Sequence, residues 1–178
     1  MSERVLRGVA ASAGVAMGPA VVYREAQPDR PTAAAGTPAE EQARYEAACR
    51  QAEAELSQLA ERADSQSREI LSAHQLMLQD PELHGRVAQA IQAGQPAEEA
   101  VRAAVEQFAG MLEALDDQYL RERAADVRDV GRRLVAALSG RTVGIRLERP
   151  AVVIARDLAP TDTIGLERSL LLGFVTEQ

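Results

Sequence analysis

The sequence predicts an α/β body built from both ends of the chain, with an all-α body inserted between them. Short apolar runs rich in β-branched residues occur at 20–23, 151–155 and 170–175, as in strands. The residues between these ends instead carry apolar side chains at three- and four-residue spacings. Aromatic residues make up only 3% of the chain, which suits closely packed helices. We assign residues 1–30 and 141–178 to the α/β body and 37–140 to the helical body.

The first block, VLRGVAASAGVAMGPAVVY, predicts a strand, a glycine-rich turn and a second strand over 20–23. Its glycines are no phosphate-binding loop, because the Gly-Lys-Ser/Thr ending is missing. Residues 27–38 carry three prolines and little apolar bulk, so we expect a connection between the two bodies there.

Helix boundaries are marked by capping residues. Thr37-Pro38 opens a helix that is expected to run past Leu59, and Asp80-Pro81 ends one helix and caps the next. Two apolar stripes then predict an antiparallel helical hairpin that turns at 116–117. The stripes are Val101, Val105, Phe108, Leu112 and Leu115, followed by Leu120, Ala124, Val127, Gly131, Leu134 and Leu138. Gly131 in a stripe predicts the close approach of another backbone.

Composition excludes several classes of function. The formal charge of −7 disfavours nucleic acid as a partner. A single cysteine, Cys49, allows no internal disulfide and indicates a reducing compartment, so we expect the cytoplasm. No stretch approaches the roughly 20 apolar residues of a membrane span. With only His74 and His84, a histidine-built metal site is not expected.

Three groups of polar or charged residues could carry chemistry or binding. Asp157 and residues 161–163 follow a predicted strand, where α/β proteins place ligands, although capping of a short helix is the simpler interpretation. His74 lies on an apolar helix face and is expected to be a packed or interface residue, with no catalytic role. The charges of 121–133 suit a solvated face with weak ion pairs.

The apolar residues around Pro81 exceed what one core stripe needs. They are Leu76, Met77, Leu78 and Leu83. They form either local core or a docking patch, and the residues alone favour neither interpretation.

Four segments resemble the N-terminal part of the Enzyme I family, the phosphoenolpyruvate-protein phosphotransferases of bacterial sugar uptake. They are RGVAASAGVAMGPAVVY, ILSAHQLMLQDPEL, LDDQYLRERAADVRDVGRR and VVIARDLAPTDT with LLLGFVT, in family order. The resemblance implies part of a swivelling phosphohistidine α/β domain with an inserted helical domain that docks the carrier protein HPr. It implies that Thr163 hydrogen-bonds the reactive histidine. The implied HPr-docking residues are Leu76, Met77, Asp80, Glu82, Leu83 and Arg123.

The sequence departs from the family pattern in two places. Ala159 stands where a capping threonine is common, so the usual cap of the short helix is expected to be absent. The chain also ends at Gln178, before the Gly-Gly-Arg-Thr-Ser-His motif that holds the phosphoacceptor histidine. We therefore expect docking without phosphoryl transfer, no catalytic residue and no cofactor in this chain.

The resemblance places phosphoenolpyruvate, Mg²⁺ and the homodimer contact of the complete family protein in later domains. Two interpretations stay open: a fragment of a phosphotransferase, or a naturally truncated module that binds HPr. A relative of pyruvate phosphate dikinase is a third option, which the inserted helical body disfavours.

Overall fold

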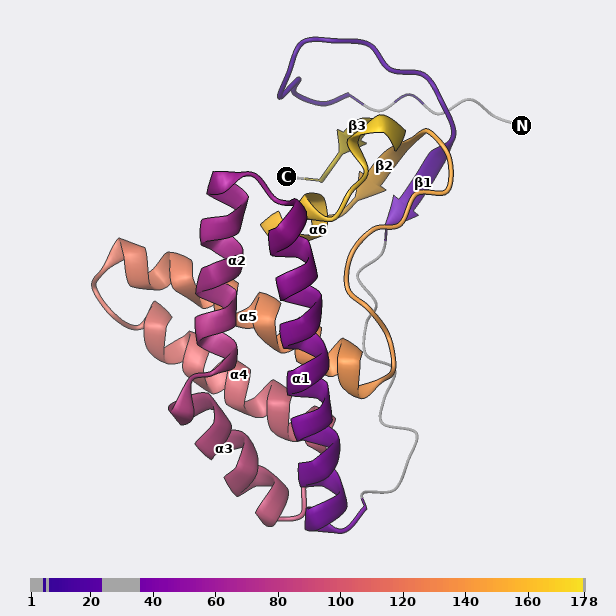
Figure 1. The fold of residues 1–178 in the computed structure, drawn as a ribbon. Coiled ribbons are helices and arrows are strands. Elements are labelled where there is room, and N and C mark those ends of the chain that lie inside the picture. The colour runs from indigo at the N-terminus through magenta and orange to yellow at the C-terminus, as the bar shows by residue number, and fades with distance from the viewer. Residues whose placement is uncertain (1–4, 6, 24–35, 178) are drawn as a thin grey trace.

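The computed structural model describes residues 5, 7–23 and 36–177, in which a helical bundle packs beside a small parallel sheet (Figure 1). This is the combination of all-α and α/β structure that the sequence predicts. The bundle contains α1 (Pro38–Arg62), α2 (Ser65–Leu78), α3 (Pro81–Gln92), α4 (Ala97–Glu113) and α5 (Gln118–Leu138). The sheet contains β1 (Ala20–Tyr23), β2 (Ala151–Ala155) and β3 (Leu171–Val175), and α6 (Pro160–Ile164) and the 3-10 turn η1 (Arg168–Leu170) connect the last two strands.

Side-chain caps start most helices of the bundle, as their sequences predict. Thr37 and Glu40 form a reciprocal capping box on α1, and Asp80 and Asp117 cap α3 and α5. Helix α4 follows Pro96 and has no side-chain cap from its own segment. The carboxylate of Glu41 on α1 supplies it instead, by accepting a hydrogen bond of 2.8 Å from the Ala97 N–H.

The α4–α5 hairpin forms the centre of the bundle core. Both predicted stripes are buried near its base, where Val101, Val105 and Leu134 lie in the core. At the tip of the hairpin Leu115 is 46% exposed, because the tip extends beyond the other helices. Gly131 is closely approached by α4, and the nearest atoms belong to the side chain of Val105. A Cβ at Gly131 would lie 2.6 Å from Cγ2 of Val105.

The sheet brings the two ends of the chain together. Its order is β1-β2-β3 with all strands parallel, and Val21 pairs with Val153 while Val153 pairs with Phe174. The predicted second strand of the N-terminal block is confirmed as β1, whereas the first is wrong, since residues 7–19 form no strand. Most of the predicted connection over 27–38 lies outside the described residues.

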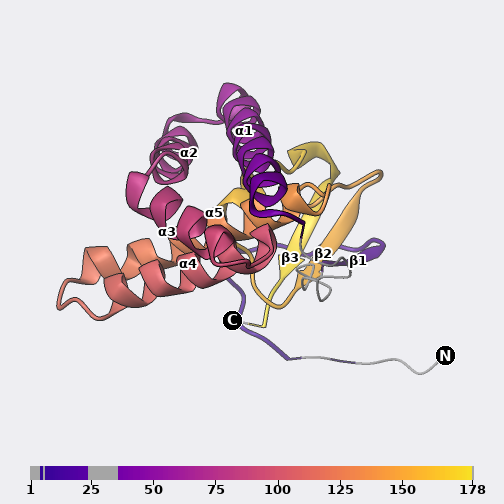
Figure 2. The same cartoon turned by 90° about the horizontal axis from the view of Figure 1, so that it is seen from below.

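The two bodies meet at α6. Both views show the bundle on one side and the strands on the other (Figures 1 and 2). In Figure 1 α6 lies next to α1, and its Thr161 contacts Asp129 of α5. The sheet has its own small core of Ile145, Val153 and Leu166. The division into domains at residues 30, 37 and 140 stays a prediction.

Candidate functional site

The junction of α2 and α3 presents one face to solvent and one to the core. Leu71, His74 and Leu78 are the buried positions of α2, at three- and four-residue spacing. Leu76, in the last turn of the helix, does not lie on that buried face, and its side chain is 71% exposed. Met77 lies between these extremes and packs against the bundle core.

Leu83 does not belong to the exposed face of the junction. Its side chain is 1% exposed and lies in the core together with Val87 and Ile91, the other apolar residues of α3. Leu83 thus packs beneath the surface of the junction in this structure, and its expected contact with a partner stays a prediction. Asp80 accepts backbone hydrogen bonds from Glu82 and Leu83 at 2.8 and 3.3 Å, which fixes the start of α3.

Two charged residues of the predicted docking set are available at the surface. Glu82 is 61% exposed and forms an i,i+4 ion pair of 2.8 Å with Arg86. Arg123 on α5 lies over the ring of Tyr119, with 5.0 Å from its guanidinium carbon to the ring centroid, and its Nε donates to the Tyr119 hydroxyl at 3.0 Å. This contact orients the guanidinium one turn from the start of α5.

Three exposed apolar side chains near the tip of the α4–α5 hairpin were missed by sequence reasoning. Met111 and Leu115 at the end of α4 are 50% and 46% exposed, and Tyr119 on α5 is 59% exposed. Met111 contacts α3, since Arg86 Nη2 lies 3.5 Å from its Sδ. Leu115 continues a core stripe in the sequence, which predicts burial. Its exposure depends on how far the hairpin extends beyond the other helices, and the stripe does not show this.

Thr163 lies on α6 and is half-buried. The predicted loss of a side-chain cap at Ala159 is confirmed. Asp162 stabilises this helix start from the other direction, because its carboxylate accepts a hydrogen bond of 3.0 Å from the Ala159 N–H. Asp162 is thus a helix-start residue, as the simpler interpretation of its sequence position predicts.

His74 is packed in the bundle, 1% exposed, as expected for a histidine on an apolar face. Its two ring nitrogens lie 3.4 Å from an oxygen of Asp126 and 3.5 Å from an oxygen of Asp129. Asp129 also pairs with Arg132, as its spacing predicts. The expectation of a solvated face is wrong for this part of α5, since Asp129 and Arg133 are 5% and 2% exposed.

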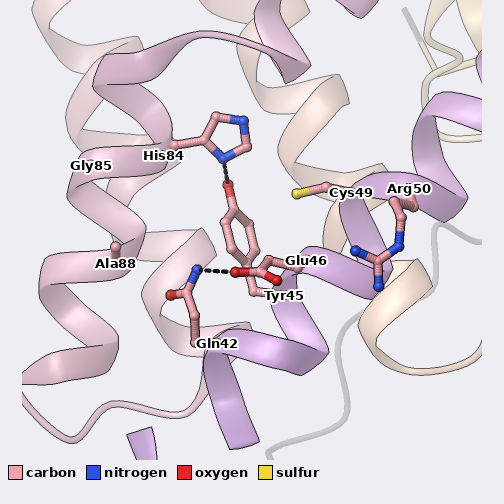
Figure 3. A pocket seen from close by; sticks show the side chains of 8 residues that line it. All are labelled: Gln42, Tyr45, Glu46, Cys49, Arg50, His84, Gly85 and Ala88. Atoms are coloured by element: carbon pink, nitrogen blue, oxygen red, sulfur yellow. Dashed lines mark hydrogen bonds between the residues drawn. The ribbon is translucent and has the colours of Figure 1, made fainter. Parts of the chain in front are cut away.

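A surface hollow between α1 and α3 is a second candidate site (Figure 3). Its lining residues are Gln42, Tyr45, Glu46, Cys49, Arg50, His84, Gly85 and Ala88. The Tyr45 hydroxyl and His84 Nδ1 are joined by a hydrogen bond of 2.8 Å. Burial raises the pKa of the Tyr45 hydroxyl and that of the Cys49 thiol, so both stay protonated at neutral pH. The hollow therefore presents no activated nucleophile among these two groups.

Neither a metal cluster nor a membrane span was found in the part of the chain that the structure describes. No three His, Cys, Asp or Glu side chains there are grouped so that they could hold a metal ion. No helix there is both long and apolar enough to cross a bilayer.

The fold consists of a helical bundle that a short helix joins to a parallel sheet, and the bundle has an exposed apolar junction. Comparison with known families identifies the class of protein that has this fold. Residues 7–123 match the family model described as PEP-utilising enzyme, N-terminal. The chain belongs to this family. Within it, the chain corresponds in sequence and fold to the N-terminal part of Enzyme I, the phosphoenolpyruvate-protein phosphotransferase.

Similarity to curated relatives and to solved structures supports this assignment. The phosphoenolpyruvate-protein phosphotransferase of Listeria monocytogenes is 36% identical over 179 residues, which cover 97% of this chain and 31% of the relative. That of Geobacillus stearothermophilus is 39% identical over 185 residues, covering 98% of this chain and 32% of the relative. The chain thus spans about a third of the length of these relatives.

Two solved structures share the fold. An NMR solution structure of Enzyme I superposes with a TM-score of 0.83 at 37% identity, covering 97% of this chain and 73% of that one. The N-terminal domain of the nitrogen Enzyme I superposes with a TM-score of 0.63 at 29% identity, covering 81% of this chain and 61% of that one.

Proposed function

We propose that this chain docks the phosphocarrier protein HPr through the exposed end of its helical bundle. The docking patch comprises Leu76, Met77, Glu82 and Arg123. The observation that carries the proposal is Leu76, a large apolar side chain that is 71% exposed at the α2–α3 junction. Exposed apolar residues clustered with a few charges are typical of protein interfaces.

The surroundings of the patch support an interface. Met111, Leu115 and Tyr119 add exposed apolar surface near the tip of the α4–α5 hairpin, where Met111 contacts Arg86 of α3. Tyr119 holds Arg123 in place by stacking and hydrogen bonding. Tyrosine and arginine are enriched among residues that dominate binding energy. Asp80 and Leu83 contribute indirectly, the first as the cap of α3 and the second as core beneath the patch.

The family of the chain supplies the chemical setting for this docking. The relatives are phosphoenolpyruvate-protein phosphotransferases, and we infer that the complete protein relays a phosphoryl group from phosphoenolpyruvate through a histidine to HPr. In that relay Thr163 would hydrogen-bond the reactive histidine. We expect the exchange to occur in the cytoplasm, consistent with a single cysteine that is half-buried.

Docking itself should require neither metal nor cofactor, because it uses only side chains of the patch. Mg²⁺ is assigned to the phosphoenolpyruvate-binding step of the complete protein. HPr affinity measured with a chelator is therefore expected to equal the affinity measured with added Mg²⁺. A strong dependence on Mg²⁺ would contradict this assignment.

The docking proposal is tested by titrating the isotope-labelled chain with HPr by NMR and calorimetry. Leu76→Ala and Arg123→Gln are each expected to weaken binding by more than about fivefold, corresponding to the loss of about 1 kcal/mol or more at an interface hot spot. Val22→Ala is a matched control, because Val22 is 59% exposed on β1, in the other body. Unchanged affinity in both patch variants, or equal weakening in the control, would overturn the proposal.

A further inference from the structure

Helix α6 contacts both bodies of the protein. Ile164 packs against the bundle core, whereas Leu158 before the helix and Leu166 after it belong to the sheet core. The α carbon of Gly165 is also close to the bundle, since a Cβ there would lie 3.2 Å from Cδ2 of Leu59 on α1. The position of α6 on the bundle therefore determines where the sheet lies.

A buried polar cluster joins α5 to α6, and we call it the α5–α6 clamp. It consists of Asp129, Arg132, Thr161 and Asp162. The Thr161 hydroxyl donates to Asp129 at 2.5 Å, and both residues are at most 5% exposed. Arg132 pairs with Asp129 on its own helix and with Asp162 on α6, the second contact being 3.2 Å long.

The clamp continues into each body. On the sheet side, Asp162 is fully buried and accepts a hydrogen bond of 3.3 Å from the Tyr23 hydroxyl at the end of β1. On the bundle side, His74 of α2 lies within 3.5 Å of both Asp129 and Asp126. Asp126 in turn lies 3.8 Å from Arg123 of the docking patch. Charged and polar groups thus lie close together from the docking patch to β1 by way of α6, although the ring nitrogens of His74 make no hydrogen bond within the described part of the chain.

Stability alone is a weak reason for such a cluster. Buried ion pairs lose solvation, and well-packed apolar residues of similar volume are often as stabilising. Two helices that meet only through apolar surfaces can shift relative to each other. Directional hydrogen bonds between them, in contrast, specify one relative position of the helices. Two carboxylates from different bodies, bridged by one guanidinium, specify the orientation of α6 on α5.

We propose that Asp129, Arg132 and Thr161 are positioning residues that hold α6, and with it Thr163, at a fixed place relative to the docking patch. The proposal rests on the proposed function only for the roles of Thr163 and of that patch. The clamp would set the orientation of the α/β body on the bundle. It would thereby also set where the reactive histidine, which Thr163 would hydrogen-bond in the complete protein, meets a docked carrier.

The test compares two substitutions at Thr161. Thr161→Val removes the hydroxyl and keeps the shape, while Thr161→Ser keeps the hydroxyl. Residual dipolar couplings of the labelled 178-residue chain report the orientation of the strands relative to α1–α5. The Asp162 and Leu166 amides donate to the carbonyl groups of Ala159 and Thr163. Their hydrogen exchange measures how stably α6 is held in place.

In Thr161→Val we expect an altered strand orientation and about tenfold faster exchange at these two amides, the factor that corresponds to one lost hydrogen bond. The amides of α4 should exchange as in the wild type. Thr161→Ser, which keeps the hydroxyl, should show the wild-type strand orientation and wild-type exchange at the two amides. Asp129→Asn should resemble Thr161→Val, and Glu113→Gln, which breaks an exposed ion pair of α4 with Arg128, should change neither readout.

An unchanged orientation in Thr161→Val would overturn the proposal, as would faster exchange spread equally over α4, which would indicate a purely structural role. HPr binding separates this result from the proposed function. Failure of the wild-type chain to bind HPr would remove the docking function and leave the orientation experiment interpretable. Should Asp129→Asn fail to fold, the two Thr161 variants decide the question alone.

Discussion

Gly131 on α5 faces the side chain of Val105 on α4 so closely that a Cβ would lie 2.6 and 2.7 Å from its two methyl groups. Contacts of this length require the neighbouring side chain or helix to move, and overpacking of a core costs about 1–3 kcal/mol. The absence of a side chain at this stripe position therefore lets α4 and α5 pack at their observed separation.

Gly131→Ala is expected to lower the free energy of unfolding by about 1 kcal/mol, since overpacking outweighs the helix propensity gained with alanine. Urea denaturation measures the change. Gly110→Ala is the control, because Gly110 lies in α4 with nothing within 4 Å of an added Cβ. It should raise stability by up to about 1 kcal/mol. A stabilised Gly131→Ala variant would show that the hairpin tolerates a wider spacing.

Glu41 is predicted to stabilise the start of α4 from another helix. Its buried carboxylate accepts backbone hydrogen bonds from Ala97 and Gly36 and pairs with Arg44. Burial raises the pKa of Glu41, but these partners lower it by more, so the carboxylate is charged at neutral pH. Glu41→Gln should lower the free energy of unfolding by about 1–3 kcal/mol.

The control for that substitution lies one turn further along α1. Glu46 is exposed and accepts a hydrogen bond from the side-chain amide of Gln42. Glu46→Gln should shift the thermal midpoint by much less than Glu41→Gln. Equal midpoints for the two variants would mean that the N-terminus of α4 does not depend on the carboxylate.

The pH dependence of stability should contain a contribution from Asp129. Burial raises the pKa of this carboxyl, but the charge of Arg132 and the hydrogen bond from Thr161 outweigh burial and leave the pKa lowered. A group with a lower pKa in the folded protein stabilises it above the unfolded pKa, about 3.9 for aspartate. This contribution is lost as the pH falls through the folded value.

We therefore expect Asp129→Asn to be less stable than the wild type at pH 6, with a difference that shrinks as the pH is lowered below about 4. Denaturation series at several pH values measure this difference. Asp116→Asn is the comparison, since the Asp116 side chain is fully exposed at the hairpin turn. A gap between wild type and Asp129→Asn that stays constant down to acid pH would contradict the ionised pairing of Asp129.

Leu83 and Leu76 should differ in what their truncation changes. Leu83→Ala removes a core side chain and is expected to cost about 2–5 kcal/mol of stability. Leu76→Ala truncates an exposed side chain and should stay within about 0.5 kcal/mol of the wild type. Chemical denaturation of both variants tests the assignment. A Leu83→Ala protein as stable as the wild type would place Leu83 outside the core.

Local signals in the sequence predicted most elements because their causes are local. Thr37, Asp80 and Asp117 cap the helices they were expected to cap, and the stripe of α5 lies in the core at Ala124, Val127 and Leu134. The period of Leu83, Val87 and Ile91 also indicated a core face. The resemblance placed Leu83 among the docking residues, which stays a prediction, whereas its burial follows from the helical period.

Contacts between distant segments could not be predicted in the same way. The spacing of Asp129 and Arg132 predicted their ion pair, but its burial results from the packing of α6, whose residues lie about 30 positions away in the chain. The exposure of Met111 and Tyr119 likewise depends on how far the hairpin extends past α2 and α3. No single window of sequence contains that information.

The pairing of β1 with β2 also has a consequence for the order of folding. The bundle is contiguous and complete at Leu138, whereas Val21 must wait for Val153 before the sheet can form. Local helical contacts form quickly, while closing a loop of this length is entropically costly and slow. During synthesis the bundle would therefore be in place first, and β1 would be left as a tethered strand that closes onto a finished scaffold.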